Sequence, residues 1–166
     1  METPVTTDTR MQSIVVLYDM QTTFFLSALE GISDNDAHQR LSTKANHVAW
    51  LAGSLVQQRF ELANMLEIPG HQTAGELFKD NKGIQDDARY PSLEVLKSDW
   101  NKITPALREA LTAVDSNKLN TFFEMMPGMN MTNYDLVTFI IYREANCIGQ
   151  IALWRRLLGY EAMKYM

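Results

Sequence analysis

The sequence predicts an all-α fold, a four-helix bundle formed by a single domain over residues 1–166. Four segments of about 20 residues place apolar side chains every third or fourth residue, which is the period of a helix buried along one side. No segment shows the sustained alternation of apolar and polar residues that is typical of a strand. A short connection follows the first segment and a long one follows the second. Helices of this length would each be about 30 Å long, as a bundle with a long crossover requires.

The first two helices are expected on either side of the short connection. Apolar residues recur at helical spacing over residues 11–29, and Gly31 supplies a stop. Residues 33–41 contain capping side chains and are expected to form at most two helical turns. The second helix is expected over residues 44–67. Because residues 48–52 are apolar on almost every side, most of its circumference should be buried.

The third helix follows a connection over residues 68–91 that is polar and rich in glycine and proline, with at most a short helix inside it. Ser92 is placed to cap the third helix, and apolar residues then step by three and four through residues 93–114. Pro105 should bend this helix, because proline has no amide proton to donate to the carbonyl of Asn101.

The fourth helix is expected over residues 136–158, after a second irregular stretch at residues 115–131. Thr132 and Asp135 have the spacing of a capping box, and Gly159 ends the helix.

Composition and charge exclude several classes of protein. The chain has 15 Lys and Arg residues against 20 Asp and Glu, a net charge of −5. Because this charge repels a phosphate backbone, no nucleic-acid partner is expected. No apolar run approaches the roughly 20 residues of a membrane-spanning helix, so no membrane association is expected either. Cys147 is the only cysteine, and the N-terminal residues lack the apolar run of a secretory signal. We therefore expect a cytoplasmic protein.

One charged residue interrupts the apolar pattern of the fourth helix. The stripe expected to face the core contains Arg143 between Ile140 and Cys147. A guanidinium taken out of water is costly unless a carboxylate or another set of acceptors pairs with it. Glu61 on the second helix is the first choice of partner for Arg143. Glu144 lies one residue off the stripe and is expected to make a contact at the helix surface or at a helix end.

Other polar residues share the side of the second helix that carries Glu61. Packed against the fourth helix, they could line a polar pocket inside the bundle, which is where this architecture usually places ligand or metal sites. Gln150 could donate an amide hydrogen bond to a ligand there. The candidate residues of this pocket are Ser54, Arg143, Cys147, His47, Trp50, Glu61 and Gln150.

Two segments of the chain resemble the DinB-like superfamily, which includes metal-dependent thiol transferases. Residues 46–55 (NHVAWLAGSL) look like the helix-two motif of that family. Residues 142–159 (YREANCIGQIALWRRLLG) are similar to its helix-four signature, and this second match is the more specific. With the predicted helix order, the resemblance covers nearly the whole chain. It implies an up-up-down-down bundle with a long link between helices two and three.

The same resemblance implies where a metal would lie. Members of the family typically hold nickel or zinc with three histidines, and the matching positions here are Ser54, Arg143 and Cys147. None of these is histidine. A serine hydroxyl is a poor ligand for such an ion, and arginine brings a permanent positive charge in place of a lone pair. The sequence therefore predicts a diverged member of the superfamily without the metal site.

Two hypotheses of function follow, and the sequence leaves open whether the protein is an enzyme. In the first, the protein has no cofactor and uses the pocket to bind a small anion, or it acts as an interaction scaffold; a homodimer is plausible. Arg143 would then either anchor the ligand or pair with a buried carboxylate. In the alternative, a metal-dependent hydrolase or thiol S-transferase holds nickel or zinc through substitute ligands such as His47, Glu61 and Cys147.

Overall fold

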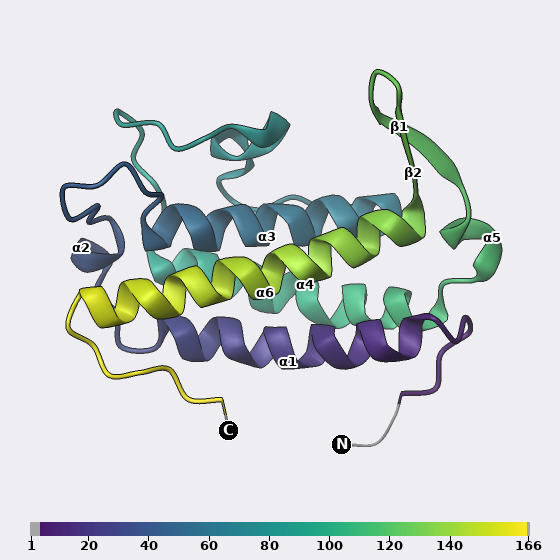
Figure 1. The fold of residues 1–166 in the computed structure, drawn as a ribbon, viewed down its shortest axis with the longest axis horizontal. Coiled ribbons are helices and arrows are strands. Elements are labelled where there is room, and N and C mark those ends of the chain that lie inside the picture. The colour runs from purple at the N-terminus through teal and green to yellow at the C-terminus, as the bar shows by residue number, and fades with distance from the viewer. Residues whose placement is uncertain (1–3, 166) are drawn as a thin grey trace.

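The computed structural model describes residues 4–165, of which 60% lie in helices, and the described residues contain a single two-stranded sheet. Four long helices lie side by side along the longest axis of the molecule (Figure 1). These are α1 (Met11–Leu29), α3 (Val48–Met65), α4 (Leu93–Ala113) and α6 (Asn133–Leu157). The shorter elements are α2 (Asp34–Ala37), the 3-10 turns η1 (Gly75–Leu77) and η2 (Lys79–Asn81), α5 (Ser116–Leu119), β1 (Phe122–Met126) and β2 (Met129–Thr132).

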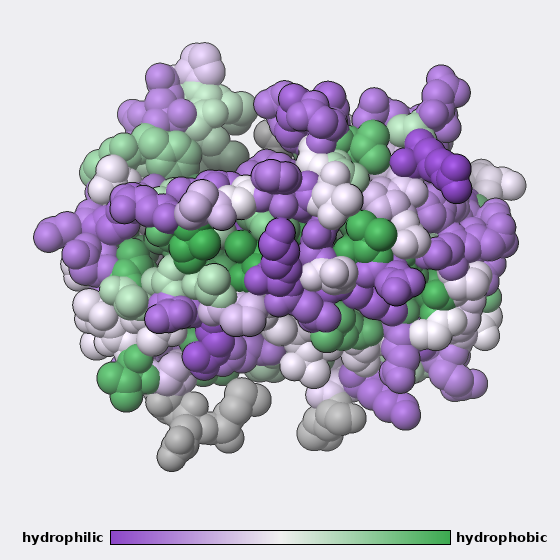
Figure 2. Space-filling view, turned by 180° about the vertical axis from the view of Figure 1, so that it is seen from behind, coloured by the Kyte–Doolittle hydropathy of each residue, from purple (hydrophilic) through white to green (hydrophobic). Residues whose placement is uncertain are grey.

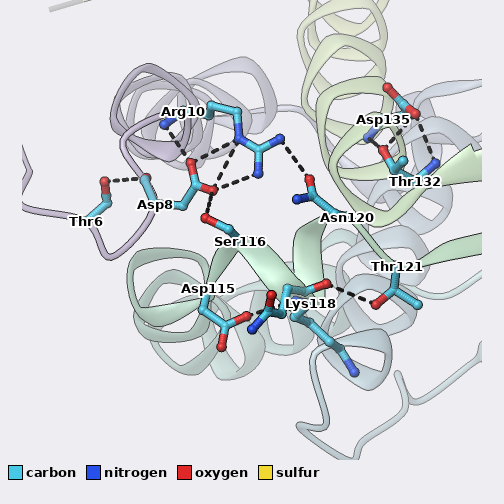
Figure 3. Close-up of polar contacts among 11 residues, drawn as sticks. Thr6, Asp8, Arg10, Asp115, Ser116, Lys118, Asn120, Thr121, Thr132 and Asp135 are labelled. Carbon is cyan, nitrogen blue, oxygen red and sulfur yellow. Dashed lines mark hydrogen bonds and ion pairs between the residues drawn. The ribbon is translucent and has the colours of Figure 1, made fainter.

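The boundaries predicted for the long helices are close to those observed, because their caps are local features. The Ser92 side chain accepts from the amide of Val95 at the start of α4, and α4 continues through Pro105. The capping box of Thr132 and Asp135 forms at the start of α6 (Figure 3). None of the helices described combines the length and the apolar composition that crossing a lipid bilayer demands.

The directions of the helices differ from the order that the resemblance implies. Thr7, just before α1, bonds to the carbonyl of Thr112 near the end of α4, and Trp154 near the end of α6 bonds to the carbonyl of Asn46 before α3. Thus α1 and α6 run one way, and α3 and α4 run the other way (Figure 1). The order along the chain is up-down-down-up, so the expected up-up-down-down order is wrong. The short link after α1 reverses the direction of the chain, so α3 runs antiparallel to α1. The long connection after α3 then leads back to the end of the molecule where α3 begins, so α4 runs parallel to α3.

The long connection, residues 66–92, packs along α3 and is called the crossover segment below. Phe78 lies directly on Gly53 of α3, where an added Cβ would come within 2.1 Å of the phenyl ring. Gln72 donates to the Gly53 carbonyl, and Thr73 donates to the carboxylate of Asp99 on α4. A glycine in the middle of α3 therefore lets the crossover segment lie close against the helix.

The expectation that the chain contains no strand is wrong for one short segment. Residues 122–132 form an antiparallel hairpin of β1 and β2, which turns at Gly128 with a φ of 81°. Every residue of both strands is exposed or half-exposed. Neither face of this hairpin is buried in the core. Its sequence therefore lacks the alternation of apolar and polar residues by which a strand is recognised.

A polar cluster connects the start of α1 to α5 (Figure 3). Asp8 accepts hydrogen bonds from the amide and the guanidinium of Arg10 and from the hydroxyl of Ser116. These donors hold the pKa of the Asp8 carboxyl well below its usual range. Arg10 also donates to Asn120 and lies 4.7 Å from the centre of the Tyr134 ring. The cluster joins distant segments of the chain at one end of the molecule.

The centre of the core holds an ion pair that the sequence did not indicate. Arg59 of α3 donates from Nε and Nη2 to the two carboxylate oxygens of Glu144 on α6, at 2.7 and 2.9 Å. The side chains of Arg59 and Glu144 are 0% and 1% exposed. The expectation that Glu144 makes a surface or helix-end contact is therefore wrong, because α6 is rotated so that Glu144 points into the core.

Side chains from the other two long helices complete the surroundings of Arg59. Its Nη1 donates to the hydroxyls of Thr22 on α1 and Thr104 on α4, at 3.0 and 2.7 Å. Its guanidinium carbon lies 4.0 Å from the ring centre of Tyr18 and 3.4 Å from that of Trp100. All four long helices therefore contribute to the environment of one buried charge.

Replacing Glu144 by alanine should lower the free energy of unfolding by about 3–5 kcal/mol, because the charge of Arg59 would stay buried without its counter-ion. The pair of Asp19 and Arg108 has the same bidentate geometry at the surface, with side chains 32% and 44% exposed. The matched variant Asp19→Ala should cost less than about 1 kcal/mol. Urea unfolding followed by circular dichroism measures both.

Equal losses in the two variants would contradict the central role of the buried pair. If Glu144→Ala does not fold, Glu144→Gln provides the comparison, because it keeps the size of the side chain and removes only the charge.

Candidate functional site

Arg143 lies on the side of α6 that faces α3 and has only neutral partners. Its Nη2 donates to the Ser54 hydroxyl at 2.8 Å, and its Nη1 donates to the side-chain amide oxygen Oε1 of Gln58 at 2.5 Å. Among residues 4–165, no carboxylate lies within 4 Å of its guanidinium nitrogens. Arg143 is half-buried. Its positive charge is therefore only partly solvated and has no counter-ion.

A pocket of about 80 Å³ adjoins Arg143 and is lined by three parts of the chain. The crossover segment contributes Phe78 and Lys82, and α6 contributes Arg143. The lining residues from α3 are Trp50, Ser54, Gln57, Gln58 and Glu61. The close contact of Phe78 with Gly53 places the crossover segment over this part of α3, so the same glycine that permits the packing also shapes the pocket.

The charge of the pocket is positive although the whole chain is acidic. Arg143 and Lys82 carry one positive charge each, and Glu61 carries one negative charge, which leaves an excess of one positive charge. The indole Nε1 of Trp50 is buried and has no acceptor among the described residues. This N–H has almost no accessible surface, so the groups that can attract an anion into the pocket are the two cationic side chains.

Glu61 lines the pocket but does not pair with Arg143 as expected. Its carboxylate accepts a hydrogen bond from Gln57 at 2.9 Å and is exposed to solvent. Gln58, one turn after Ser54, lies nearer to Arg143 and supplies the acceptor instead. The expected ion pair is therefore absent, and the buried carboxylate of this region belongs to Glu144, which pairs with Arg59.

Gln150 lies away from the pocket. It is exposed, and its amide donates to Asn146 on the outward side of α6 at 2.7 Å. The apolar stripe predicted for this helix is offset by one residue from the observed one. The buried residues of α6 are Asn133, Val137, Ile140, Ile141, Glu144, Cys147, Ile148, Ile151, Trp154 and Arg155.

His47 is the N-cap of α3. Its Nδ1 accepts a hydrogen bond from the amide of Trp50 at 3.0 Å, and its ring lies 5.3 Å from that of His38 and 5.1 Å from that of Tyr90. Burial, together with the charges of His38 and Arg40, lowers the pKa of His47 to about 4. A neutral ring nitrogen that already caps a helix has no free lone pair for a base or a metal ligand.

Cys147 is buried one turn beyond Arg143 and is not among the residues that line the pocket. Burial raises the pKa of its thiol, and the carboxylate of Glu144 adds to this effect, while Arg143 opposes it. The balance is upward, so the neighbouring guanidinium does not activate the thiol.

The three positions implied for a metal do not form a suitable set of ligands. The Ser54 hydroxyl oxygen already accepts a hydrogen bond from the positively charged Arg143. Cys147 contributes a protonated thiol beside that guanidinium. Within residues 4–165, no three His, Cys, Asp or Glu side chains are grouped so that they could hold a metal ion together. The residues present therefore do not fit the metal that the resemblance implies.

Several residues of the pocket were not anticipated from the sequence. Gln58 is four residues after Ser54, and this helical spacing was the one signal that could have revealed it. Phe78 and Lys82 come from the crossover segment, whose residues have no periodicity to indicate which side chains turn toward α3.

The stability of the protein should fall as the pH is lowered from about 6.5 to about 4 because of His47. In this window the unfolded chain binds a proton at this residue and the folded protein does not. His47→Asn keeps a capping oxygen and should remove a pH-dependent difference on the order of 2 kcal/mol. Urea unfolding at several pH values measures it. His71→Asn, at an exposed position, is the matched control and should leave the profile unchanged.

Cys147 should react slowly with a thiol reagent in the folded protein. At pH 8 its labelling should be at least about tenfold slower than in urea, because the thiol is both buried and protonated. Following the colour released by an aromatic disulfide reagent measures both rates. Rapid labelling of the native protein would show an activated thiol and would contradict this assignment.

A scan of the sequence against models of known protein families finds no match, and a search among curated proteins finds no similar sequence. The function of the pocket therefore has to be inferred from its own residues and geometry.

Proposed function

We propose that this protein binds a small anion, through a single carboxylate or a group of similar size, in the pocket beside Arg143. The observation that carries the proposal is the half-buried guanidinium of Arg143, which has neutral partners and no counter-ion among the described residues. Arginine has five N–H donors in a planar fork that matches a carboxylate. Two of its nitrogens already bond to Ser54 and Gln58, so the guanidinium is held in place before a ligand arrives.

We also propose that the four long helices form a bundle of the DinB-like type that has lost its metal centre. The long link between α3 and α4 and the two motifs over residues 46–55 and 142–159 support this origin, whereas the observed up-down-down-up order departs from the order that the resemblance implies. An arginine at a metal-ligand position would place a fixed positive charge where relatives hold a cation. Such an exchange converts a site for a positive ion into a site for a negative one.

The volume of the pocket limits the ligand to a small group. A pocket of about 80 Å³ has room for several waters or for one carboxylate. Two cationic side chains are available to such a group: Arg143, and Lys82, whose ammonium also donates to the carbonyl of Glu76. Gln57, Gln58, Glu61 and Lys82 are at least partly exposed, so the remainder of a larger molecule could extend into solvent.

The test is a titration with formate, followed by tryptophan fluorescence and by calorimetry. The best small ligands gain about 1.5 kcal/mol for each non-hydrogen atom, so formate should bind with a Kd no tighter than about 0.5 mM. Arg143→Gln should weaken binding at least tenfold while changing the free energy of unfolding by less than about 1 kcal/mol, because its partners are neutral. Arg156→Gln, at an exposed position on the same helix, should bind formate as the unchanged protein does.

Equal formate affinities in the unchanged protein, Arg143→Gln and Arg156→Gln would contradict the proposal.

The alternative of a metal-dependent hydrolase or thiol transferase is tested on the same preparation by elemental analysis of the untagged protein. We expect far less than one metal ion per chain. Stoichiometric nickel or zinc that is lost in Cys147→Ser would show that substitute ligands hold a metal, and would overturn the proposed origin of the site.

A further inference from the structure

The outward face of α6 has no charge over more than four turns. Between residues 138 and 153, the only charged residues of the helix are Arg143, which faces the pocket, and Glu144, which is buried. The exposed residues in this span are Thr138, Phe139, Tyr142, Ala145, Asn146, Gly149, Gln150 and Leu153. In a chain with a net charge of −5, such a face is unusual for a helix that stays in water.

The other sides of the molecule differ from this face. The exposed residues of α4 include Glu94, Lys102, Arg108 and Glu109. The surface on the α4 side, seen in Figure 2, is largely hydrophilic, with its hydrophobic residues in separate patches. In contrast, α1, which packs beside α6, has Asp19 as its one charged residue, and Arg108 of α4 neutralises it. The exposed residues of α1 and of residues 138–153 of α6 therefore carry no unpaired charge.

We propose that this face binds a second copy of the same chain, with the two α6 helices packed antiparallel about a twofold axis near Asn146. A twofold interface brings the same surface of each copy together, so it requires a patch that is complementary to itself. An uncharged face is complementary to itself in this sense, because no two like charges repel each other across the twofold axis.

The spacing of residues on α6 supports an antiparallel arrangement. Phe139 and Leu153, which are 42% and 60% exposed, each lie seven residues from Asn146 and therefore share its side of the helix. In an antiparallel pair centred on Asn146, Phe139 of one copy lies opposite Leu153 of the other, and this contact occurs twice. The two Asn146 amides meet at the axis, and an asparagine at a single such position fixes the register of paired helices.

Charges at the two ends of the helix favour the same arrangement. Asp135 lies 11 residues before Asn146, and Arg156 lies ten residues after it; both are exposed. Antiparallel packing places Asp135 of one copy near Arg156 of the other at each end. Parallel packing would place like charges together and would be unfavourable at both ends.

A glycine and a groove provide space for the close approach. Gly149 lies in the middle of the face, and an added Cβ there would meet no atom within 4 Å, so the packing of this chain alone does not require glycine. Beside it is a mainly apolar groove of about 240 Å³, lined by Leu17, Met20, Phe24, Ile148, Gly149 and Tyr165. Tyr142, which is 66% exposed, lies opposite Gln150 of the other copy and therefore next to this groove.

The size of the face predicts a weak dimer. The distance from Asp135 to Arg156 spans about 32 Å of helix, and two neighbouring helices are about 20 Å wide. The footprint is thus roughly 600 Å² on each copy, which is near the lower limit of specific interfaces. Dissociation should therefore be visible at micromolar concentrations.

Sedimentation velocity of the full chain from about 5 to about 500 µM tests the proposal, since a small interface should dissociate within that range. The unchanged protein should shift from monomer to dimer. Leu153→Glu should weaken the dimer at least tenfold, because it places a carboxylate opposite Phe139. Phe122→Glu in β1 is the matched control: the same kind of change at a residue that is 72% exposed should have no effect.

Cross-linking tests the register. In a Cys147→Ser background, Asn146→Cys should form a disulfide-linked dimer under mild oxidation, because the two residues meet at the axis, whereas Asn101→Cys on the exposed side of α4 should not. A protein that is monomeric at every concentration overturns the proposal. A dimer that resists Leu153→Glu, or that Phe122→Glu disrupts, overturns it as well, since the contact would then lie on another surface.

Discussion

The ion pair of Arg59 and Glu144 is the interaction on which the arrangement of the long helices depends. A fully buried guanidinium is unfavourable unless a counter-ion neutralises its charge and acceptors pair with its N–H groups. Here the carboxylate comes from α6, hydroxyls come from α1 and α4, and the aromatic rings of Tyr18 and Trp100 cover the guanidinium. Because each long helix supplies one part of this environment, sliding or rotating any of them would leave a polar group unmatched. The pair therefore specifies a unique packing that apolar side chains alone would specify less strictly.

Two neighbouring residues of α6 show how the core and the pocket are separated. Successive residues of a helix are about 100° apart. Glu144 therefore points into the core, and Arg143 points to the edge of the α3–α6 contact. The positive charge in the core is neutralised, and the positive charge at the edge is not. Arg59 is thus neutralised inside the core, while Arg143 is held by neutral acceptors beside the pocket in which we propose that an anion binds. The crossover segment, seated on Gly53, covers this edge and forms one wall of the pocket.

The sequence predicted the long helices well and the site only in part, for identifiable reasons. Caps such as Ser92 and the Thr132–Asp135 box are local, so the helix boundaries could be located. Periodicity alone could not decide between two stripes of α6 offset by one residue, and so Arg143 rather than Glu144 was assigned to the core. It also could not reveal Arg59, whose partners are distant in sequence on three other helices. Lys82 and Phe78 reach the pocket from a segment without periodicity, and the exposed hairpin lacks the buried face that makes a strand recognisable.

Arg59 has a counter-ion and Arg143 has none among the described residues, and one measurement tests directly whether this difference determines where an anion binds. Crystals of the protein soaked in bromide, with diffraction recorded at the bromine absorption edge, would locate the preferred anion sites without assuming a particular ligand. We predict an anomalous peak in contact with the guanidinium of Arg143, within the pocket shared with Ser54 and Lys82, and no peak beside Arg59. A pocket without bromide, or one that contains a metal ion bound by Cys147, would contradict this interpretation of the site.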